Sequence, residues 1–255
     1  MQDRACRFSV CVDAVFEGVP EVEAIRRVKQ SGLDAIEFWR WWDKDLAAIR
    51  DCCSQHDVSI AAICTKFISL VDADKRNDYV TGVIDSAKAA AQLNCSTLIS
   101  QVGDYLPGVD RQTQRESLVA GLVEVAPILE EAGITLVIEP LNDRIDHPGY
   151  FLVNSDEAFE IVEQVDSPRV KVLFDIYHQQ ISEGHIIERL IGHCEQIGHL
   201  HAAGNPGRHE LTRGELAYPE IFRSLSQTNY EGFIGLEYWP VDDPISGLRT
   251  WADFK

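Results

Sequence analysis

Four side chains that could hold a metal ion each follow or close a short apolar run of the sequence. Glu139 follows "LVI", Asp175 closes "VLFD", His201 closes "GHLH" and Glu237 closes "IGLE". A buried carboxylate without a partner is costly, so three carboxylates and one imidazole at corresponding positions indicate a shared cation. Three oxygen donors and one nitrogen suit a divalent ion such as Mn²⁺, Mg²⁺ or Co²⁺, whereas Zn²⁺ more often recruits additional nitrogen or sulfur.

The chemistry that such an ion supports is proton transfer next to a carbonyl group. A divalent ion that chelates a carbonyl and the adjacent hydroxyl polarises the carbonyl and acidifies the neighbouring C–H bond. A carboxylate can remove this proton to give an enediolate, and a carboxylate can return it elsewhere. Glu139 and Glu237 come from runs three apart in the chain order, so they could flank a bound substrate. Return to a neighbouring carbon is aldose–ketose isomerisation, and return to the opposite face is epimerisation. Neither reaction requires an organic cofactor.

Basic side chains near these runs are candidates for substrate binding. His178 follows Asp175 by three residues, and Arg208 lies in the segment after His201. A guanidinium can bind a carboxylate through two hydrogen bonds, so Arg208 is a candidate for an acidic substrate. Lys66, after the run "AAIC", could meet the same carboxylate, with a solvated loop lysine as the alternative.

Other residues near the run ends are expected to have supporting roles. His199 would share a strand face with His201, and we expect it to pack beside the site rather than to bind the ion. Gln101 could bind a substrate hydroxyl, and His147 could contact the substrate from a loop. A tryptophan cluster is more often packing than chemistry, so its members are expected only to cover the site: Trp39, Trp41 and Trp42.

The elements that must position these residues are eight short strand-like runs, separated by stretches of helical periodicity. Such alternation predicts right-handed βαβ units, and eight units in 255 residues match a (β/α)₈ barrel, whose chemistry lies where strands end. An open doubly wound sheet is the alternative, but no Gly-rich phosphate motif follows the first run. We therefore predict one TIM-barrel domain over residues 1–255. The expected strands cover residues 8–12, 35–39, 59–64, 96–103, 134–142, 170–178, 197–204 and 232–239, and the expected helices cover 21–31, 45–56, 75–93, 111–132, 155–165, 186–194 and 218–227.

The composition restricts the partners and the compartment. The formal net charge is −18, which opposes nucleic-acid binding because a polyanion requires a concentrated positive surface. No apolar run has the length of a membrane span, and the first residues lack the pattern of a signal peptide. With seven cysteines in no metal-binding spacing, we expect a cytoplasmic protein with reduced thiols. The sequence leaves open whether the chain forms a homo-oligomer.

Longer motifs resemble the hydroxypyruvate isomerase family, within the xylose isomerase-like barrels that include sugar phosphate isomerases and epimerases. The resemblance covers nearly the whole chain and is carried by "AAGNPGRHELTRGELAYPEIF", "YEGFIGLEYWP", "VIEPLN", "GYFLVNS" and "LFDIYHQQ". It implies a TIM barrel, with Glu139 and Glu237 as the acid–base pair and His178 and Arg208 contacting substrate oxygens. By the same resemblance, the metal ligands carry over to Glu139, Asp175, His201 and Glu237.

One departure from this family bears on the substrate. The best-known hydroxypyruvate isomerases have glutamine where this chain has His201, and histidine there is usual in the related ketose 3-epimerases. The resemblance therefore implies an isomerase for a small hydroxy-oxo acid, converting hydroxypyruvate to tartronate semialdehyde. The alternative is a ketose 3-epimerase, or another aldose–ketose isomerase, that acts on a free sugar. Metal-dependent apurinic endonucleases share this barrel type, but they need several metal ions, more histidine ligands and a basic face.

Overall fold

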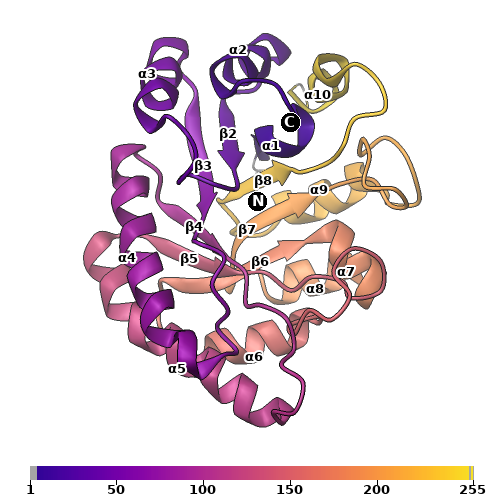
Figure 1. Cartoon of the computed structure of the whole chain (residues 1–255). Helices are drawn as coiled ribbons and strands as arrows, with labels where there is room; N and C mark the ends of the chain where they lie inside the picture. Colours follow the sequence, from indigo (N-terminus) through magenta and orange to yellow (C-terminus); the bar gives the residue numbers. More distant parts are fainter. Residues whose placement is uncertain (1–4, 253, 255) are drawn as a thin grey trace.

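The predicted strands form a closed parallel barrel, with helices outside it (Figure 1). The computed structural model describes residues 5–252 and residue 254. Neighbouring strands pair in sequence order, and the first strand pairs with the last to close the ring. This topology confirms the (β/α)₈ barrel expected from the alternation of runs. The strands are β1 (Arg7–Cys11), β2 (Ala35–Phe38), β3 (Ser59–Cys64), β4 (Thr97–Ser100), β5 (Thr135–Ile138), β6 (Val170–Asp175), β7 (Ile197–Ala202) and β8 (Phe233–Leu236).

Helix boundaries follow capping signals in the sequence. The longest helix begins after Asp110, whose side chain accepts a 3.0 Å hydrogen bond from the Thr113 backbone N–H, and it ends at Gly133, where φ is +68°. In the part of the chain that the structure describes, no helix is long and apolar enough to cross a membrane. The helices are α1 (Val12–Val15), α2 (Glu21–Ser31), α3 (Leu46–His56), the 3₁₀ turn η1 (Ala73–Lys75), α4 (Arg76–Gln92), α5 (Arg111–Ala132), α6 (Ser155–Val165), α7 (Ile176–Ser182), α8 (Ile186–Gly192), α9 (Tyr218–Ser226) and α10 (Pro244–Ala252).

The structure differs from the sequence prediction mainly after the strands. Residues 170–178 are predicted as one strand, but β6 ends at Asp175 and α7 begins at the next residue. The Asp175 carboxylate accepts hydrogen bonds from the backbone N–H groups of Tyr177 (2.7 Å) and His178 (3.2 Å), so it caps a helix. Helices α1 and α10 are also absent from the prediction, since four residues and a Pro-led terminal segment carry little periodic signal.

The interior of the barrel is divided between apolar and polar side chains. An apolar cluster comes from β3 to β6, and a polar group comes from β1, β2 and β7. Inward and outward residues alternate along each strand, so Ser9 and Glu37 lie inside while their neighbours pack against the helices. The polar group consists of Ser9, Glu37, His199 and His201, which contact one another through Glu37. The apolar cluster consists of Ala62, Cys64, Ile99, Val137 and Leu173.

Phe222→Ala is expected to lower the free energy of unfolding by about 3–5 kcal/mol, because it leaves a cavity in the outer core. Phe222 on α9 is fully buried, with ring centroids 5.3 Å from Phe8 and 5.4 Å from Trp251. Urea denaturation followed by circular dichroism measures this loss. Val123→Ala on α5 is the control, since Val123 is 48 % exposed and should cost less than about 0.5 kcal/mol. Equal losses of unfolding free energy in the two variants would contradict the assignment of Phe222 to the buried core.

Candidate metal and substrate site

The four predicted ligands meet at the carboxyl ends of the strands. Asp175 closes β6 and His201 lies in β7, while Glu139 and Glu237 directly follow β5 and β8. One ligand atom from each residue can be chosen so that all four lie within 4.8 Å of one another. Each of the four residues is at most 5 % exposed. The barrel thus gathers three buried carboxylates and one imidazole around a single point, as the sequence pattern predicts.

The donor atoms at this point fit a divalent cation. His201 Nδ1 lies 3.4 Å from Glu139 Oε1 and 3.4 Å from Glu237 Oε2. Ligand bonds of about 2.1 Å separate neighbouring ligand atoms by about 3.0 Å in octahedral geometry and about 3.4 Å in tetrahedral geometry, so these spacings are compatible with a shared ion. His201 Nδ1 and Glu139 Oε1 are buried and make no hydrogen bond with the residues that the structure describes. Buried polar atoms of this kind require a partner, which a cation would supply.

The two glutamates have different electrostatic surroundings. Burial raises the pKa of Glu139 to about 7, opposed by His201 and reinforced by the negative charges of Glu237 and Asp175. Burial also acts to raise the pKa of Glu237, but the positive charges of His201 and Arg208 outweigh it and hold that pKa well below its usual range. Carboxylates with pKa values pushed apart are typical of acid–base pairs.

Arg208 brings a positive charge to the same carboxylates. Its guanidinium donates a hydrogen bond to Glu237 and lies 3.8 Å from Asp175 Oδ2. The group lies 5.3 Å from the ring centroid of Tyr177 and 5.1 Å from that of Trp239, and its side chain is 12 % exposed. Aromatic rings at these distances attract a guanidinium by cation–π interaction. Arg208 is therefore placed to meet a negatively charged group inside the cavity.

His178 presents one ring nitrogen to the site. Its Nδ1 accepts a 2.6 Å hydrogen bond from the Asn142 side-chain amide, so a neutral ring carries its proton on Nε2. Burial, together with the positive charge of Arg208, lowers the pKa of His178 well below its ordinary value. Nε2 lies 3.6 Å from Asp175 Oδ2, is buried and makes no hydrogen bond with a described residue. A neutral imidazole with a free N–H can donate to a substrate oxygen.

A cavity of about 230 Å³ opens over three of the four ligands, Glu139, His201 and Glu237. Gln101 and His147, predicted as substrate contacts, are among its lining residues, and Lys66 is not. The Lys66 ammonium instead pairs with Asp85 on α4 at 3.1 Å, so the structure does not bring Lys66 to the cavity. This position agrees with the alternative expectation that Lys66 is a solvated loop lysine. The lining consists of Trp39, Cys64, Phe67, Ile99, Gln101, Glu139, Leu141, His147, His178, His201, Arg208, Glu237 and Trp239.

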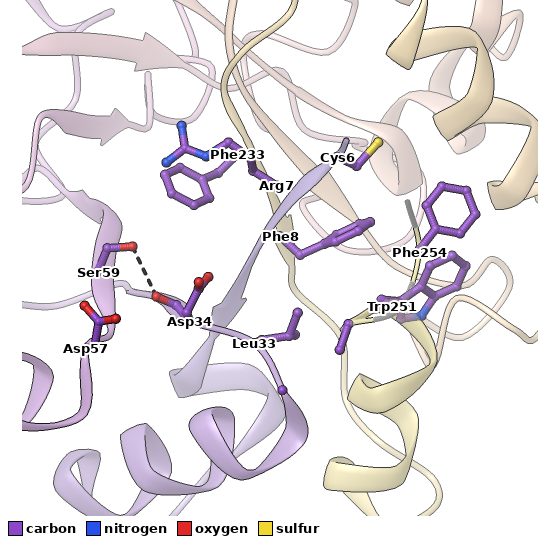
Figure 2. A pocket seen from close by; sticks show the side chains of 12 residues that line it. Cys6, Arg7, Phe8, Leu33, Asp34, Asp57, Ser59, Phe233, Trp251 and Phe254 are labelled. Atoms are coloured by element: carbon purple, nitrogen blue, oxygen red, sulfur yellow. Dashed lines mark hydrogen bonds between the residues drawn. The ribbon is translucent and has the colours of Figure 1, made fainter. Parts of the chain in front are cut away.

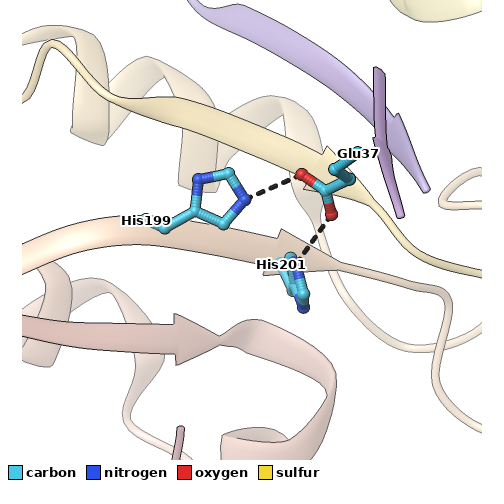
Figure 3. Close-up of side chains that lie close together, drawn as sticks. All are labelled: Glu37, His199 and His201. Atoms are coloured by element: carbon cyan, nitrogen blue, oxygen red, sulfur yellow. Dashed lines mark hydrogen bonds and ion pairs between the residues drawn. The ribbon is translucent and has the colours of Figure 1, made fainter. Parts of the chain in front are cut away.

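Two residues of the site escaped the sequence prediction. Trp39, expected only to cover the barrel, donates a 2.6 Å hydrogen bond from its indole N–H to Glu237 Oε1. Glu37, in the middle of β2, is 2 % exposed and contacts both His199 and His201 at 2.8 Å (Figure 3). His199 does not face the carboxylate cluster, in line with the packing role expected for it. The sequence feature that could have indicated a role for Glu37 is an acidic residue inside the apolar run "AIEFW", where a buried charge needs a partner.

A larger cavity of about 400 Å³ lies at the opposite end of the barrel, where β1, β2, β3 and β8 begin (Figure 2). Figure 2 shows Phe8, Trp251 and Phe254 on one side of it and Asp34 and Asp57 on another. Both acids are exposed, so nothing there resembles the buried, convergent donors at the carboxyl ends. In TIM barrels this end serves stability rather than chemistry.

Comparison with known proteins gives the class first. Residues 25–253 match the family model described as "Xylose isomerase-like TIM barrel". The chain therefore belongs to the xylose isomerase-like TIM barrel family. A crystal structure titled AP endonuclease, family 2, from Brucella melitensis has a TM-score of 0.93 with 30 % identity, covering 98 % of this chain and 99 % of that one.

Curated relatives give the kind of enzyme. Hydroxypyruvate isomerase from Escherichia coli (strain K12) is 27 % identical over 97 % of this chain and 98 % of its own. 2-Oxo-tetronate isomerase from Pectobacterium atrosepticum is 31 % identical over 71 % of this chain and 70 % of its own. The chain is an isomerase. These relatives agree with the resemblance seen in the sequence motifs.

Proposed function

We propose that this isomerase depends on a divalent metal ion and converts a small hydroxy-oxo acid, with hydroxypyruvate to tartronate semialdehyde as the leading reaction. The observation that carries the proposal is the convergence of Glu139, Asp175, His201 and Glu237 within 4.8 Å at the carboxyl end of the barrel. When bound there, Mn²⁺, Mg²⁺ or Co²⁺ would polarise the substrate carbonyl and acidify the adjacent C–H bond. No organic cofactor is needed for this chemistry.

Glu139 and Glu237 are the proposed acid–base pair. They follow β5 and β8, three strands apart in the ring, and both line the cavity. One carboxylate removes the proton from the carbon beside the carbonyl, and a carboxylate returns a proton to the neighbouring carbon. Trp39 and Arg208 each hold one oxygen of Glu237, whereas Glu139 Oε1 has no hydrogen-bond partner among the described residues. Glu237 is thus held in a fixed orientation.

An acidic substrate is favoured by the charge and size of the cavity. Arg208 supplies a guanidinium at the cavity wall, and His178 offers a free N–H to a second oxygen. The volume of about 230 Å³ lies below the 300–1,000 Å³ typical of drug-sized ligand sites, in keeping with a substrate of few carbons. Relatives named for hydroxypyruvate and for 2-oxo-tetronate also point to hydroxy-oxo acids.

A second candidate reaction is epimerisation or isomerisation of a free ketose. His201 favours it, because the resemblance associates histidine at this position with ketose 3-epimerases. A nuclease activity is opposed by the net charge of −18, since phosphate backbones are bound by clustered lysine and arginine. We expect neither nucleic acid nor membrane among the partners.

The proposal is tested with a panel of hydroxypyruvate, 2-oxo-tetronates and C3–C6 ketoses, with Mn²⁺, Mg²⁺ and Co²⁺, followed by NMR. We expect conversion of a hydroxy-oxo acid that stops on chelation and returns when metal is added. Deuterium from heavy water should enter the product at the carbon that exchanges its proton. If no compound is converted with any of the metals, the proposal is wrong; conversion of ketoses alone supports the second candidate.

Arg208→Gln is expected to raise KM for the acid substrate by about 10–100-fold, which corresponds to one charge-assisted hydrogen bond of about 1.5–3 kcal/mol. The KM for a neutral ketose should rise far less in this variant, because a ketose carries no carboxylate for the guanidinium to bind. Steady-state kinetics on both substrates measures the difference. Lys66→Met is the matched comparison, since its ammonium pairs with Asp85 outside the cavity. An effect of Lys66→Met on KM as large as that of Arg208→Gln would contradict this assignment.

A further inference from the structure

Glu37 lies inside the barrel with both oxygens occupied by contacts from other strands. Its Oε2 accepts 2.8 Å hydrogen bonds from Ser9 Oγ on β1 and from His199 Nε2 on β7. Its Oε1 lies 2.8 Å from His201 Nε2 (Figure 3). A carboxylate that is 2 % exposed has no solvent to compensate it, so these three contacts are its solvation. The carboxylate of Glu37 thus contacts two histidines and does not line the cavity.

The contact with His201 determines which of its nitrogens faces the carboxylate cluster. Two lone pairs 2.8 Å apart would repel, so Nε2 carries a proton; the pair is a charge contact, because the two atoms do not meet the geometry of a hydrogen bond. The opposite nitrogen, Nδ1, points at Glu139 and Glu237, at 3.4 Å from each. When a metal ion binds, the ring must be neutral, and a proton kept on Nε2 beside Glu37 then leaves the lone pair of Nδ1 facing that ion. A carboxylate behind a metal-binding imidazole also makes the ring a more basic ligand.

Gly235 on β8 leaves the room that this arrangement needs. His201 pairs with Gly235 in the register of β7 and β8, and Ser9 pairs with it in the register of β1 and β8. A Cβ atom at Gly235 would lie 2.4 Å from Glu37 Oε1 and 2.6 Å from His201 Cδ2. Such distances are far shorter than real Cβ contacts, so a side chain there would push the pair apart. The absence of a side chain at this position fits the close pairing of Glu37 with His201.

A second cation between Glu37, His199 and His201 is a weaker explanation of the same cluster. Both imidazole nitrogens lie 2.8 Å from a Glu37 oxygen. Ligand atoms of one ion at bonds of about 2.1 Å lie about 3.0 Å apart in octahedral and about 3.4 Å apart in tetrahedral geometry, and the 2.8 Å contact of His199 with Glu37 Oε2 is a hydrogen bond instead. Ser9 also occupies Glu37 Oε2, leaving little freedom for that oxygen to turn toward an ion. The hydrogen bonds of Ser9 and His199 to Glu37 Oε2 therefore favour a protonated cluster over a second bound ion.

We infer that Glu37 is a positioning residue for the metal centre, which orients His201 through Nε2 and is itself held by Ser9 and His199. The inference rests on the proposed metal site and goes beyond it, since Glu37 touches neither metal nor substrate. Its role is to fix the ring of His201 so that Nδ1 faces the three carboxylates. Removing the charge of Glu37 should weaken the metal site without removing a ligand.

Glu37→Gln is expected to weaken Mn²⁺ binding by about 10–100-fold, the usual cost of losing such a partner. Isothermal titration calorimetry of the metal-stripped full chain with MnCl₂ measures the Kd, without reference to activity. Glu183→Gln is the matched control: its carboxylate is also largely buried, accepts a hydrogen bond from the Ser155 backbone N–H and pairs with Arg189 at 3.6 Å, but it does not line the cavity. This control should keep the wild-type Kd. If Glu37→Gln fails to fold, Glu37→Asp replaces it in the test. The shorter side chain keeps the negative charge but moves it away from His201, and we expect it to weaken Mn²⁺ binding by at least about fivefold.

A double-mutant cycle separates positioning from a general effect on the fold. In the His201→Ala background Glu37→Gln should change the Mn²⁺ Kd by less than about threefold, because the ring that Glu37 orients is gone. A purely structural role of Glu37 would weaken binding equally in both backgrounds, and that result would overturn the inference. A wild-type Kd in Glu37→Gln would also overturn it while leaving the metal site intact. If the wild-type chain bound no Mn²⁺, the proposed metal site itself would fail, and the inference with it.

Discussion

Glu139→Gln is expected to lower kcat by about 10²–10⁴-fold, the usual contribution of a general acid or base. The amide keeps an oxygen near the site but cannot take up a proton at neutral pH. Glu139 is buried, lies 3.4 Å from His201 Nδ1 and has an oxygen without a hydrogen-bond partner among the described residues. Trp39 and Arg208 donate hydrogen bonds to Glu237. Among the described residues, none donates such a hydrogen bond to the Glu139 carboxylate, so Glu139 is the less constrained of the two glutamates, and its second oxygen is the one proposed to reach the substrate. The effect should fall on kcat more than on KM, because the lost interaction is made in the transition state.

The measurement is steady-state turnover of the best substrate from the panel at saturating Mn²⁺, together with deuterium exchange at the substrate carbon. Saturating metal separates loss of proton transfer from loss of metal, since glutamine remains a neutral oxygen ligand. Glu183→Gln removes the same charge away from the cavity and should retain wild-type turnover. A Glu139→Gln enzyme that kept turnover within about threefold of wild type would exclude Glu139 from the proton transfer.

Asp175→Asn is expected to weaken Mn²⁺ binding by at least about 100-fold, more than the loss of a partner outside the ligand set. The substitution removes one negative charge from the ligand cluster while keeping the size of the side chain. Asp175 Oδ1 also caps α7 through the backbone N–H groups of Tyr177 and His178. An asparagine oxygen can accept the same hydrogen bonds, because asparagine is as good an N-cap as aspartate. The fold should therefore survive the loss of metal affinity.

Calorimetry with MnCl₂ measures the affinity, and thermal unfolding in the presence of a chelator measures the stability of the metal-free chain. We expect the two metal-free proteins to unfold within a few degrees of one another. Adding Mn²⁺ should raise the unfolding temperature of the wild type but not of Asp175→Asn, since a ligand stabilises only the state that binds it. Equal stabilisation of the two proteins by the same Mn²⁺ concentration would mean that Asp175 is not a ligand.

The barrel and its ligand set could be predicted from the sequence for the same physical reason. The alternation of β-branched runs with helical periodicity specifies βαβ units, and parallel strands in a closed barrel bring all their carboxyl ends to one rim. Glu139, Asp175, His201 and Glu237 each stand where an apolar run ends, so the topology alone predicts that they lie near one another. No knowledge of side-chain packing was needed for that step.

Contacts across the barrel interior depended on the tertiary structure. Glu37 and His199 are 162 positions apart, and Trp39 and Glu237 are 198 positions apart. Period-two alternation predicts which residues of a strand face inward. The register and shear of the barrel decide which of these inward residues meet, and neither can be predicted from the sequence of a single strand.

Lys66 shows the same limit at the rim of the barrel. Its position after β3 predicted a substrate contact, yet Asp85 on α4 draws its ammonium away from the cavity. The sequence by itself therefore determined the barrel, the rim and the convergence of four candidate ligands, because these follow from periodicity and strand order. Only the tertiary structure decided which side chains support them, because that depends on packing between residues distant along the chain.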